Sequence, residues 1–500
     1  MRATMPPRMA TTLSLPAFRR VRVLRLALVV GSLALIAFAT FVYSWSLMVR
    51  AAGKPMWLDE YFALTASVRQ PSLLGWITQG VPNQGSPSPL DYLFVRALDA
   101  TRFATGFFGL PPHTYSRLVS IVAIVASGIA GVVVAVSPSF RQFAGRPPWV
   151  KFAAAATTVC CLVAYWFQPF ALEYGTQMRP YALWLALSFV AYAVALRSDS
   201  RWWLMTAWLA VAATATASLF QIATLALACT VVDTLRGRTW RDIAKDSLLP
   251  LAVPLVVAGY YALRAGKWHY WGPEWGTWRD FFSFWYGWRT VAFLSGAGVG
   301  ISMLRPDTRR FAVPCLAMLL LYAAAPLIYF VTRQRGFFFT NRQYVYYDLA
   351  GPLFMLTAVR CLATIEARSR QALALAAILC VGCPLITARL IEGGREPKAA
   401  WRAWRAGRWP TFPTDPEGTV ARTLRGGSLP RAFCLADEGA TEGSVRNLEL
   451  VAEWVPVHYR NPIGQEIVYV VSEGDGARVR SDHVAICTGP HYVAVHARAQ

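Results

Sequence analysis

The chain has 500 residues, of which 55% are hydrophobic and 20 are tryptophan, and its mean hydropathy is +0.37. This composition excludes an ordinary soluble domain and is typical of a polytopic membrane protein. A net charge of +22 would suit nucleic acid, but residues 391–500 hold 13 basic and 13 acidic residues, so the excess belongs to the apolar part. We therefore assign it to cytoplasmic loops and anionic lipid contact, and expect no nucleic-acid partner.

Apolar segments follow one another along most of the chain. A helix that crosses a bilayer needs about 20 mostly apolar residues. Candidate segments lie near 26–49, 116–137, 152–170, 180–196, 203–219, 220–235, 247–263, 285–303, 311–331, 345–364 and 372–390. The sequence thus predicts an all-α polytopic membrane protein with about eleven transmembrane helices in residues 26–390.

The distribution of Lys and Arg predicts the orientation, because these residues resist translocation. Residues 1–25 are basic and are expected in the cytoplasm, and alternate loops after them are also rich in Lys and Arg. An odd number of spans then places the first loop, 50–115, and residues 391–500 outside. The basic N-terminal stretch does not have the pattern of a cleavable signal, because its apolar run is long and lacks a small-residue cleavage site.

The first outer loop carries the most unusual residues of the chain. Asp59 and Glu60 are adjacent carboxylates just beyond the first apolar segment. A Pro-rich turn, Ser86–Leu90, precedes the run Asp91–Leu98, whose apolar residues recur at helical spacing. We expect this run to lie in the membrane interface as a shelf beside the two acids.

Three further clusters are expected on the outer side. Glu173–Tyr181 opens the fourth span, Lys267–Trp275 is rich in aromatic residues, and residues 333–344 contain three arginines. Arginines on this side run against the positive-inside rule. The binding of an anionic group is the usual reason for such an exception. For the aromatic run Trp268–Trp271 we favour an interfacial belt over a sugar-stacking surface.

Together these motifs resemble a known family. Trp-Leu-Asp-Glu at 57–60, Pro-Ser-Pro-Leu-Asp-Tyr-Leu at 87–93, Met-Arg-Pro-Tyr-Ala-Leu at 178–183 and Asn-Arg-Gln-Tyr at 341–344 occur in the order and spacing of the GT-C superfamily of membrane glycosyltransferases. Within it the chain is most similar to bacterial polyprenyl-phosphate-sugar-dependent enzymes related to protein mannosyltransferases and the lipid A aminoarabinose transferase. The resemblance covers residues 25–390.

The resemblance implies transfer of a sugar from a polyprenyl-phosphate donor to a hydroxyl of a lipid, glycan or protein acceptor, with inversion. Such a transfer needs a base for the acceptor hydroxyl and cations for the departing phosphate. The implied base is Asp59. Glu60 is its implied partner, which orients the acceptor or tunes the base, because two close carboxylates separate each other's pKa values. The alternative is that one acid pairs with a nearby Arg or caps a helix.

The same resemblance implies a set of phosphate-binding residues at the outer ends of the spans. Guanidinium groups bind phosphate in a bidentate manner without a metal. Arg179 and Arg342 are the preferred ligands, and the alternative for both is snorkelling at the interface. The remaining candidates, which lipid headgroups or an aromatic belt would also explain, are Tyr181, Tyr344, Arg333 and Arg335.

No pattern of metal-ligand spacing, nucleotide-phosphate loop or dinucleotide fingerprint is present, and the chain has only six histidines. We therefore expect no metal, with a divalent cation held by Asp59 and Glu60 as the alternative.

Residues 391–500 are predicted to form a small extracytoplasmic α/β domain. Strand-like runs lie at 431–436, 466–472 and 483–488, and a helix is expected at 443–455. Cys434 and Cys487 lie in two of these runs, and an oxidising compartment would permit a disulfide between them. The domain would cover the site or select the acceptor, with a regulatory or stabilising role as the alternative.

The implied location is the inner membrane of a bacterium, with the site on the periplasmic side. A transporter or lipid flippase is the leading alternative, since charges at a membrane also mark translocation paths. Against it, the sequence has no evident internal repeat of the kind that many transporters carry. A third reading is a noncatalytic protein that binds polyprenyl lipids.

Overall fold

A computed structural model describes most of the apolar part of the chain and three strands near its C-terminus. The described residues are 31, 34, 36–51, 60, 63–69, 72–81, 87–110, 112–197, 200–265, 289–334, 346, 348–392, 467–471, 483–488 and 492–497.

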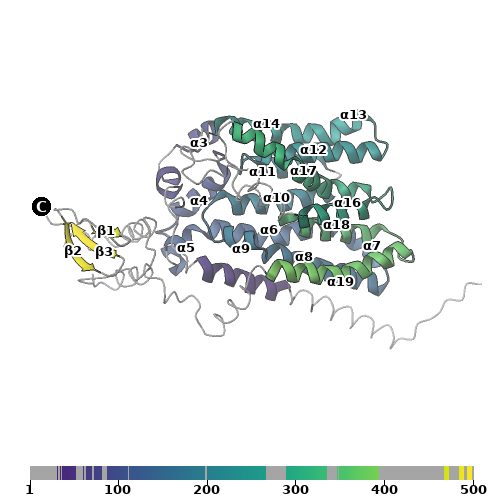
Figure 1. The fold of residues 1–500 in the computed structure, drawn as a ribbon, viewed down its shortest axis with the longest axis horizontal. Coiled ribbons are helices and arrows are strands. Elements are labelled where there is room, and N and C mark those ends of the chain that lie inside the picture. The colour runs from purple at the N-terminus through teal and green to yellow at the C-terminus, as the bar shows by residue number, and fades with distance from the viewer. Residues whose placement is uncertain are drawn as a thin grey trace, which may run out of the picture.

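The described part of residues 31–392 is built of helices (Figure 1). A first helix, Ile36–Ala51, precedes the labelled ones. These are α3 Leu73–Gln79, α4 Leu90–Ala100, α5 Pro112–Ser116, α6 Leu118–Val136, α7 Phe140–Ala144, α8 Pro148–Trp166, α9 Pro169–Tyr174, α10 Pro180–Arg197, α11 Arg201–Ala212, α12 Ser218–Leu235, α13 Trp240–Ile243, α14 Leu249–Arg264, α16 Arg289–Ser302, α17 Val313–Gln334, α18 Ala350–Thr364 and α19 Arg370–Glu392.

Seven helical segments in the described residues are long and apolar enough to cross a membrane. They are Leu118–Ala144, Pro148–Trp166, Pro180–Arg197, Ser218–Leu235, Trp240–Arg264, Arg309–Ile328 and Arg370–Arg389. The prediction of a polytopic helical membrane fold is therefore confirmed. The remaining predicted spans coincide with shorter helices, such as α11 and α16, and the count of eleven stays a prediction.

Proline marks the start of several helices, because it lacks the N–H that an α-helix leaves unpaired there and its fixed φ suits the first turn. Pro148 begins α8, Pro169 begins α9 and Pro180 begins α10. Pro180 thus ends the segment that joins α9 to α10, residues 175–179.

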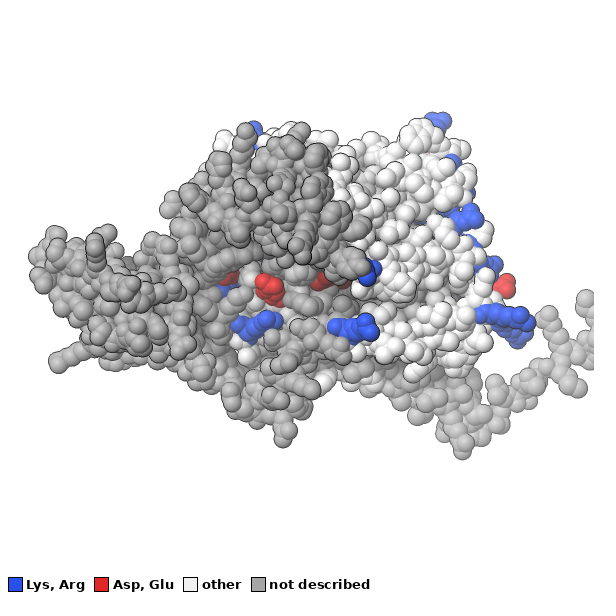
Figure 2. Space-filling view, viewed as in Figure 1, with Lys and Arg blue, Asp and Glu red and all other residues white. Residues whose placement is uncertain are grey.

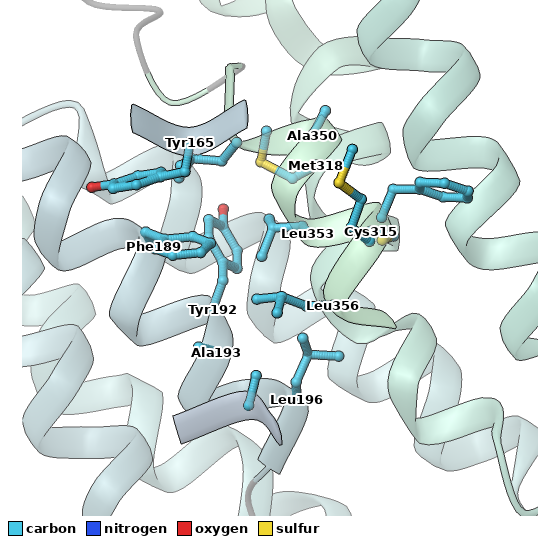
Figure 3. Packing of buried hydrophobic residues seen from close by; sticks show 14 of the residues in the cluster. Tyr165, Phe189, Tyr192, Ala193, Leu196, Cys315, Met318, Ala350, Leu353 and Leu356 are labelled. Atoms are coloured by element: carbon cyan, nitrogen blue, oxygen red, sulfur yellow. The ribbon is translucent and has the colours of Figure 1, made fainter. Parts of the chain in front are cut away.

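The core lies where α8, α10, α17 and α18 meet (Figure 3). Tyr165 of α8 stacks on Phe189 of α10 with ring centroids 4.3 Å apart. The hydroxyl of Tyr165 lies 2.6 Å from Ser127 Oγ, so its polar end is paired although the ring is buried. Across from these rings, Met318 of α17 and Leu353 of α18 are fully buried. Tight packing of this kind fixes the helices that carry the polar site described below.

Gly131 lets α6 approach α10 closely. A Cβ at this position would lie 2.5 Å from Cε1 of Phe189, whereas a Cβ at Gly296 of α16 would meet nothing within 4 Å. We expect Gly131→Ala to destabilise the protein by about 1–3 kcal/mol, because the stacked ring must shift. Gly296→Ala is the matched control and should be neutral or slightly stabilising. Thermal unfolding in detergent measures both, and equal midpoints would contradict the packing described.

The two ends of the helical bundle differ in their helices and in their content of Lys and Arg. Figure 1 shows α3, α4 and α5 at one end, and α7 and α13 at the other. Lys and Arg side chains gather along the end with α7 and α13 in Figure 2. Basic loops at one end of a helical bundle are what the positive-inside rule expects of a cytoplasmic face.

The shelf predicted at Asp91–Leu98 is a helix, α4, which has eleven residues and is too short to span a bilayer. It is amphipathic, with Tyr92 and Val95 buried and Phe94 51% exposed. Its first N–H, that of Leu90, donates to the carbonyl of Ala213 at 2.9 Å. The start of α4 is therefore fixed to the loop between α11 and α12.

Three strands, β1 Ile467–Val471, β2 His483–Thr488 and β3 Tyr492–Ala497, form an antiparallel sheet in the order β1-β3-β2. β3 pairs residue by residue with β1, and a bulge between Ala485 and Cys487 interrupts its pairing with β2. Two of the three predicted strands are thus present. The run at 431–436, the helix at 443–455 and Cys434 lie outside the described residues.

Candidate functional site

Glu60 and Arg117 form a bidentate ion pair in the interior. Arg117 Nη2 lies 2.8 Å from Oε2 of Glu60, and Arg117 Nε donates to Oε1 at 3.1 Å. Both side chains are 0% exposed. Because a lone charge is costly to bury, each group compensates the buried charge of the other.

The pair joins three segments that are far apart in the sequence. Arg117, which precedes α6, also donates from Nη1 to the carbonyl of Ala51 at 2.7 Å, at the end of the first helix. Oε1 of Glu60 accepts a second hydrogen bond, from the backbone N–H of Met178. Glu60 is therefore bound both to the residue before α6 and to the turn before α10.

That turn, residues 175–179, is held at several points. Ser120 Oγ donates to the carbonyl of Gln177 at 2.6 Å, and Thr176 Oγ1 donates to that of Glu173 at 2.8 Å. A Cβ at Gly175 would lie 2.6 Å from the carbonyl oxygen of Ala171, so only glycine fits here without a shift. The turn thus presents Arg179, the residue after Met178, at a fixed position.

Arg179 lies directly before α10, which begins at Pro180 and has no acidic residue in its first turn. Its side chain is partly exposed, and Cζ lies 5.9 Å from the centroid of the Tyr181 ring. The partial positive charge of a helix N-terminus and a guanidinium are thus placed together. This arrangement is suited to an anion.

Asp91, the second residue of α4, faces the same region. It is 1% exposed, and its Oδ1 has no hydrogen-bond partner in the part of the chain that the structure describes. Burial raises the pKa of the Asp91 carboxyl to about 7, and the positive charge of Arg179 opposes this shift. We call Glu60, Asp91, Arg117 and Arg179 the polar cluster.

The structure thus brings together some predicted site residues and leaves others outside its description. Glu60, Arg179 and Tyr181 lie in or beside the polar cluster. The placement of Asp59, Arg335, Arg342 and Tyr344 is not described, and Arg333 is described only as part of the backbone of α17. Their assigned roles stay predictions.

Arg117, Asp91 and Asp348 were not among the predicted site residues. Arg117 could have been found, because it is an arginine at the predicted outer end of a span, the same signal that singled out residues 333–344. Asp348 precedes α18 and accepts a hydrogen bond from the backbone of Phe170, near the start of α9. Its place beside α9 depends on tertiary packing and has no local signal.

Cation ligands are not clustered in the described residues: no three His, Cys, Asp or Glu side chains there come close enough to hold a metal ion. Asp59 falls outside this description. The alternative of a cation shared by Asp59 and Glu60 therefore remains a hypothesis, although both oxygens of Glu60 already accept hydrogen bonds.

No protein-family model matches the sequence, and no curated protein matches it. Among solved structures, the chain is similar to ArnT from Cupriavidus metallidurans bound to undecaprenyl phosphate, with 16% identity, a TM-score of 0.46, and coverage of 93% of this chain and 97% of that one. It is also similar to ArnT from the same organism in the apo state, with 14% identity, a TM-score of 0.39, and coverage of 94% of this chain and 98% of that one.

Proposed function

We propose that this chain is a membrane glycosyltransferase of the GT-C type, which moves a sugar from a polyprenyl-phosphate donor to an acceptor hydroxyl at the outer face of the membrane. The observation that carries the proposal is the polar cluster at one end of an apolar helical bundle. There a cation at a helix start lies beside buried carboxyls, and this combination suits a lipid-linked phosphate and the proton transfer of a sugar-transfer reaction.

The orientation rests on charge. Lys and Arg gather at the end with α7 and α13 (Figure 2). We place that end in the cytoplasm, and the polar cluster at the periplasmic side of a bacterial inner membrane. A sugar carried on a polyprenyl phosphate has its reactive carbon near the membrane surface, where we propose that α4 lies as a shelf.

In the proposed mechanism Asp59 takes the proton of an acceptor hydroxyl. The oxygen of that hydroxyl forms a bond to the anomeric carbon, on the face opposite the phosphate. The bond between that carbon and the phosphate oxygen breaks, and its electron pair leaves with the polyprenyl phosphate, whose charge Arg179 and Arg342 stabilise. The anomeric configuration is inverted.

Glu60 has a positioning role in this proposal and does not contact the acceptor. Both of its oxygens are occupied by Arg117, and one also accepts from Met178. Since Asp59 is the residue before Glu60, we propose that the ion pair also positions Asp59. We further propose that residues 391–500 cover the site or select the acceptor.

Arg179→Gln tests the phosphate site directly. We expect at least a tenfold (about 1.4 kcal/mol) loss of affinity for undecaprenyl phosphate, because a charge-assisted contact is removed. Calorimetric titration of the detergent-solubilised protein measures it. Arg201→Gln is the matched control, since Arg201 begins α11 and lies over Trp202 with Cζ 5.7 Å from its centroid. Equal affinity in the wild type and Arg179→Gln would contradict the proposed site.

A further inference from the structure

Asp91 is a buried acid that the proposed mechanism does not use. It is 1% exposed, and Oδ1 has no hydrogen-bond partner among the described residues. Two other buried polar atoms near Asp91 or Arg179 in the sequence also have no partner among the described residues: Ser88 Oγ, three residues before Asp91, and Gln177 Oε1, two residues before Arg179. Buried polar atoms are almost always hydrogen-bonded in native proteins, so a buried carboxyl oxygen without a partner calls for a ligand.

The surroundings of Asp91 favour its neutral form. Burial raises the pKa of its carboxyl to about 7, against the lowering effect of Arg179. The other charged groups near α4 are engaged elsewhere: Arg69 and Arg102 bind Asp99, Arg117 binds Glu60, and Arg96 donates to the carbonyl of Val68. Within the described residues, Arg179 is thus the charge that acts on Asp91.

We propose that Asp91, in its protonated form, donates a hydrogen bond to the phosphate held by Arg179, so that donor binding takes up a proton. This inference rests on the proposed function. An ionised Asp91 would repel the phosphate and partly cancel the charge of Arg179, whereas the neutral acid is a hydrogen-bond donor. The two states of one side chain therefore have opposite effects on the affinity for the same ligand.

The sign of the pH dependence follows. Below about pH 7 the acid is already protonated in the free protein and the phosphate binds at full affinity; above it, binding must first supply a proton, and the affinity falls by up to tenfold for each pH unit. Asparagine is neutral at every pH and is also a hydrogen-bond donor. Asp91→Asn should therefore bind tightly throughout the range.

The test uses farnesyl methyl phosphate, a phosphodiester that keeps a single negative charge over the whole range, with the full-length protein in detergent. From about pH 6 to about pH 8.5 we expect the wild-type affinity to fall about 30-fold, and that of Asp91→Asn to stay constant. Asp99→Asn is the matched control: it is a buried aspartate on the same helix, paired with Arg69 and Arg102, and should keep the wild-type pH dependence.

The outcomes separate this inference from the proposed function. A pH-independent wild-type affinity, or a pH dependence that persists in Asp91→Asn, overturns the role of Asp91 and leaves the glycosyltransferase assignment standing. Absence of binding at every pH contradicts both. Misfolding is not expected of Asp91→Asn, because replacing a buried acid by its neutral isostere removes no hydrogen bond to the carboxyl that the structure records.

Discussion

Replacing Arg117 by methionine is expected to destabilise the protein by about 3–5 kcal/mol, because the change leaves the Glu60 carboxylate buried and without its counter-charge. Both side chains are 0% exposed, so water cannot replace the lost partner. The substitution also frees the carbonyl of Ala51, which Arg117 now binds. Equilibrium unfolding in mixed micelles measures the loss, and sugar transfer should fall with it, since the backbone next to Asp59 is no longer fixed.

Two further variants show whether the loss of stability in Arg117→Met comes from the broken buried pair or would follow the removal of any arginine. Arg305→Met breaks an exposed pair with Asp307, at 3.5 Å, and should cost less than about 1 kcal/mol. The double variant Glu60→Gln/Arg117→Met removes both charges and should regain part of the stability lost by Arg117→Met. If Arg117→Met and Arg305→Met were equally stable, the buried pair would have no structural role.

Asp59→Asn is expected to lower the rate of sugar transfer by about 10²–10⁴-fold, the usual contribution of a general base. The amide keeps the size of the side chain but cannot take a proton from the acceptor. Affinity for the polyprenyl-phosphate donor should be unchanged, because the proposed phosphate contacts are made by arginines. The measurement is the initial rate of transfer at saturating donor, beside a calorimetric titration of the same preparation.

Glu366→Gln is the control for Asp59→Asn, because Glu366 is an exposed acid in the loop between α18 and α19. Arg146 binds this loop at the carbonyl of Ile365 and not at the Glu366 side chain. Its transfer rate should equal that of the wild type. A folded Asp59→Asn protein that transfers sugar at the wild-type rate would exclude Asp59 as the base.

The helices were predictable because their signals are local. A long apolar run marks a span, and Pro148, Pro169 and Pro180 mark the starts of three helices. The single span expected at 203–219 is interrupted in the structure, because α11 ends at Ala212 and α12 begins at Ser218. The carbonyl of Ala213 between them accepts from Leu90, a contact across 123 residues that the apolar pattern does not encode. The sequence analysis did not predict β3, Tyr492–Ala497, although valines recur at every second position, 493 and 495, as in a strand.

The site was only partly predictable, for the same reason. Motif order singled out Glu60 and Arg179, but the partner of Glu60 lies 57 residues further along the chain. Whether a carboxylate faces a substrate or an arginine depends on how helices pack, and the sequence left both readings open. Asp91 was placed correctly on a helix, yet its burial and the nearby charge of Arg179 depend on tertiary packing, which has no local signal.

The most direct test of the proposed function is sugar transfer by the purified protein across a panel of sugar donors. The proposal predicts release of polyprenyl phosphate and transfer of sugar with one or more polyprenyl-phosphate sugars, no transfer with nucleotide sugars, and loss of activity in Asp59→Asn. Movement of lipid across the bilayer by reconstituted protein, without transfer from any donor in the panel, would contradict it and favour a flippase.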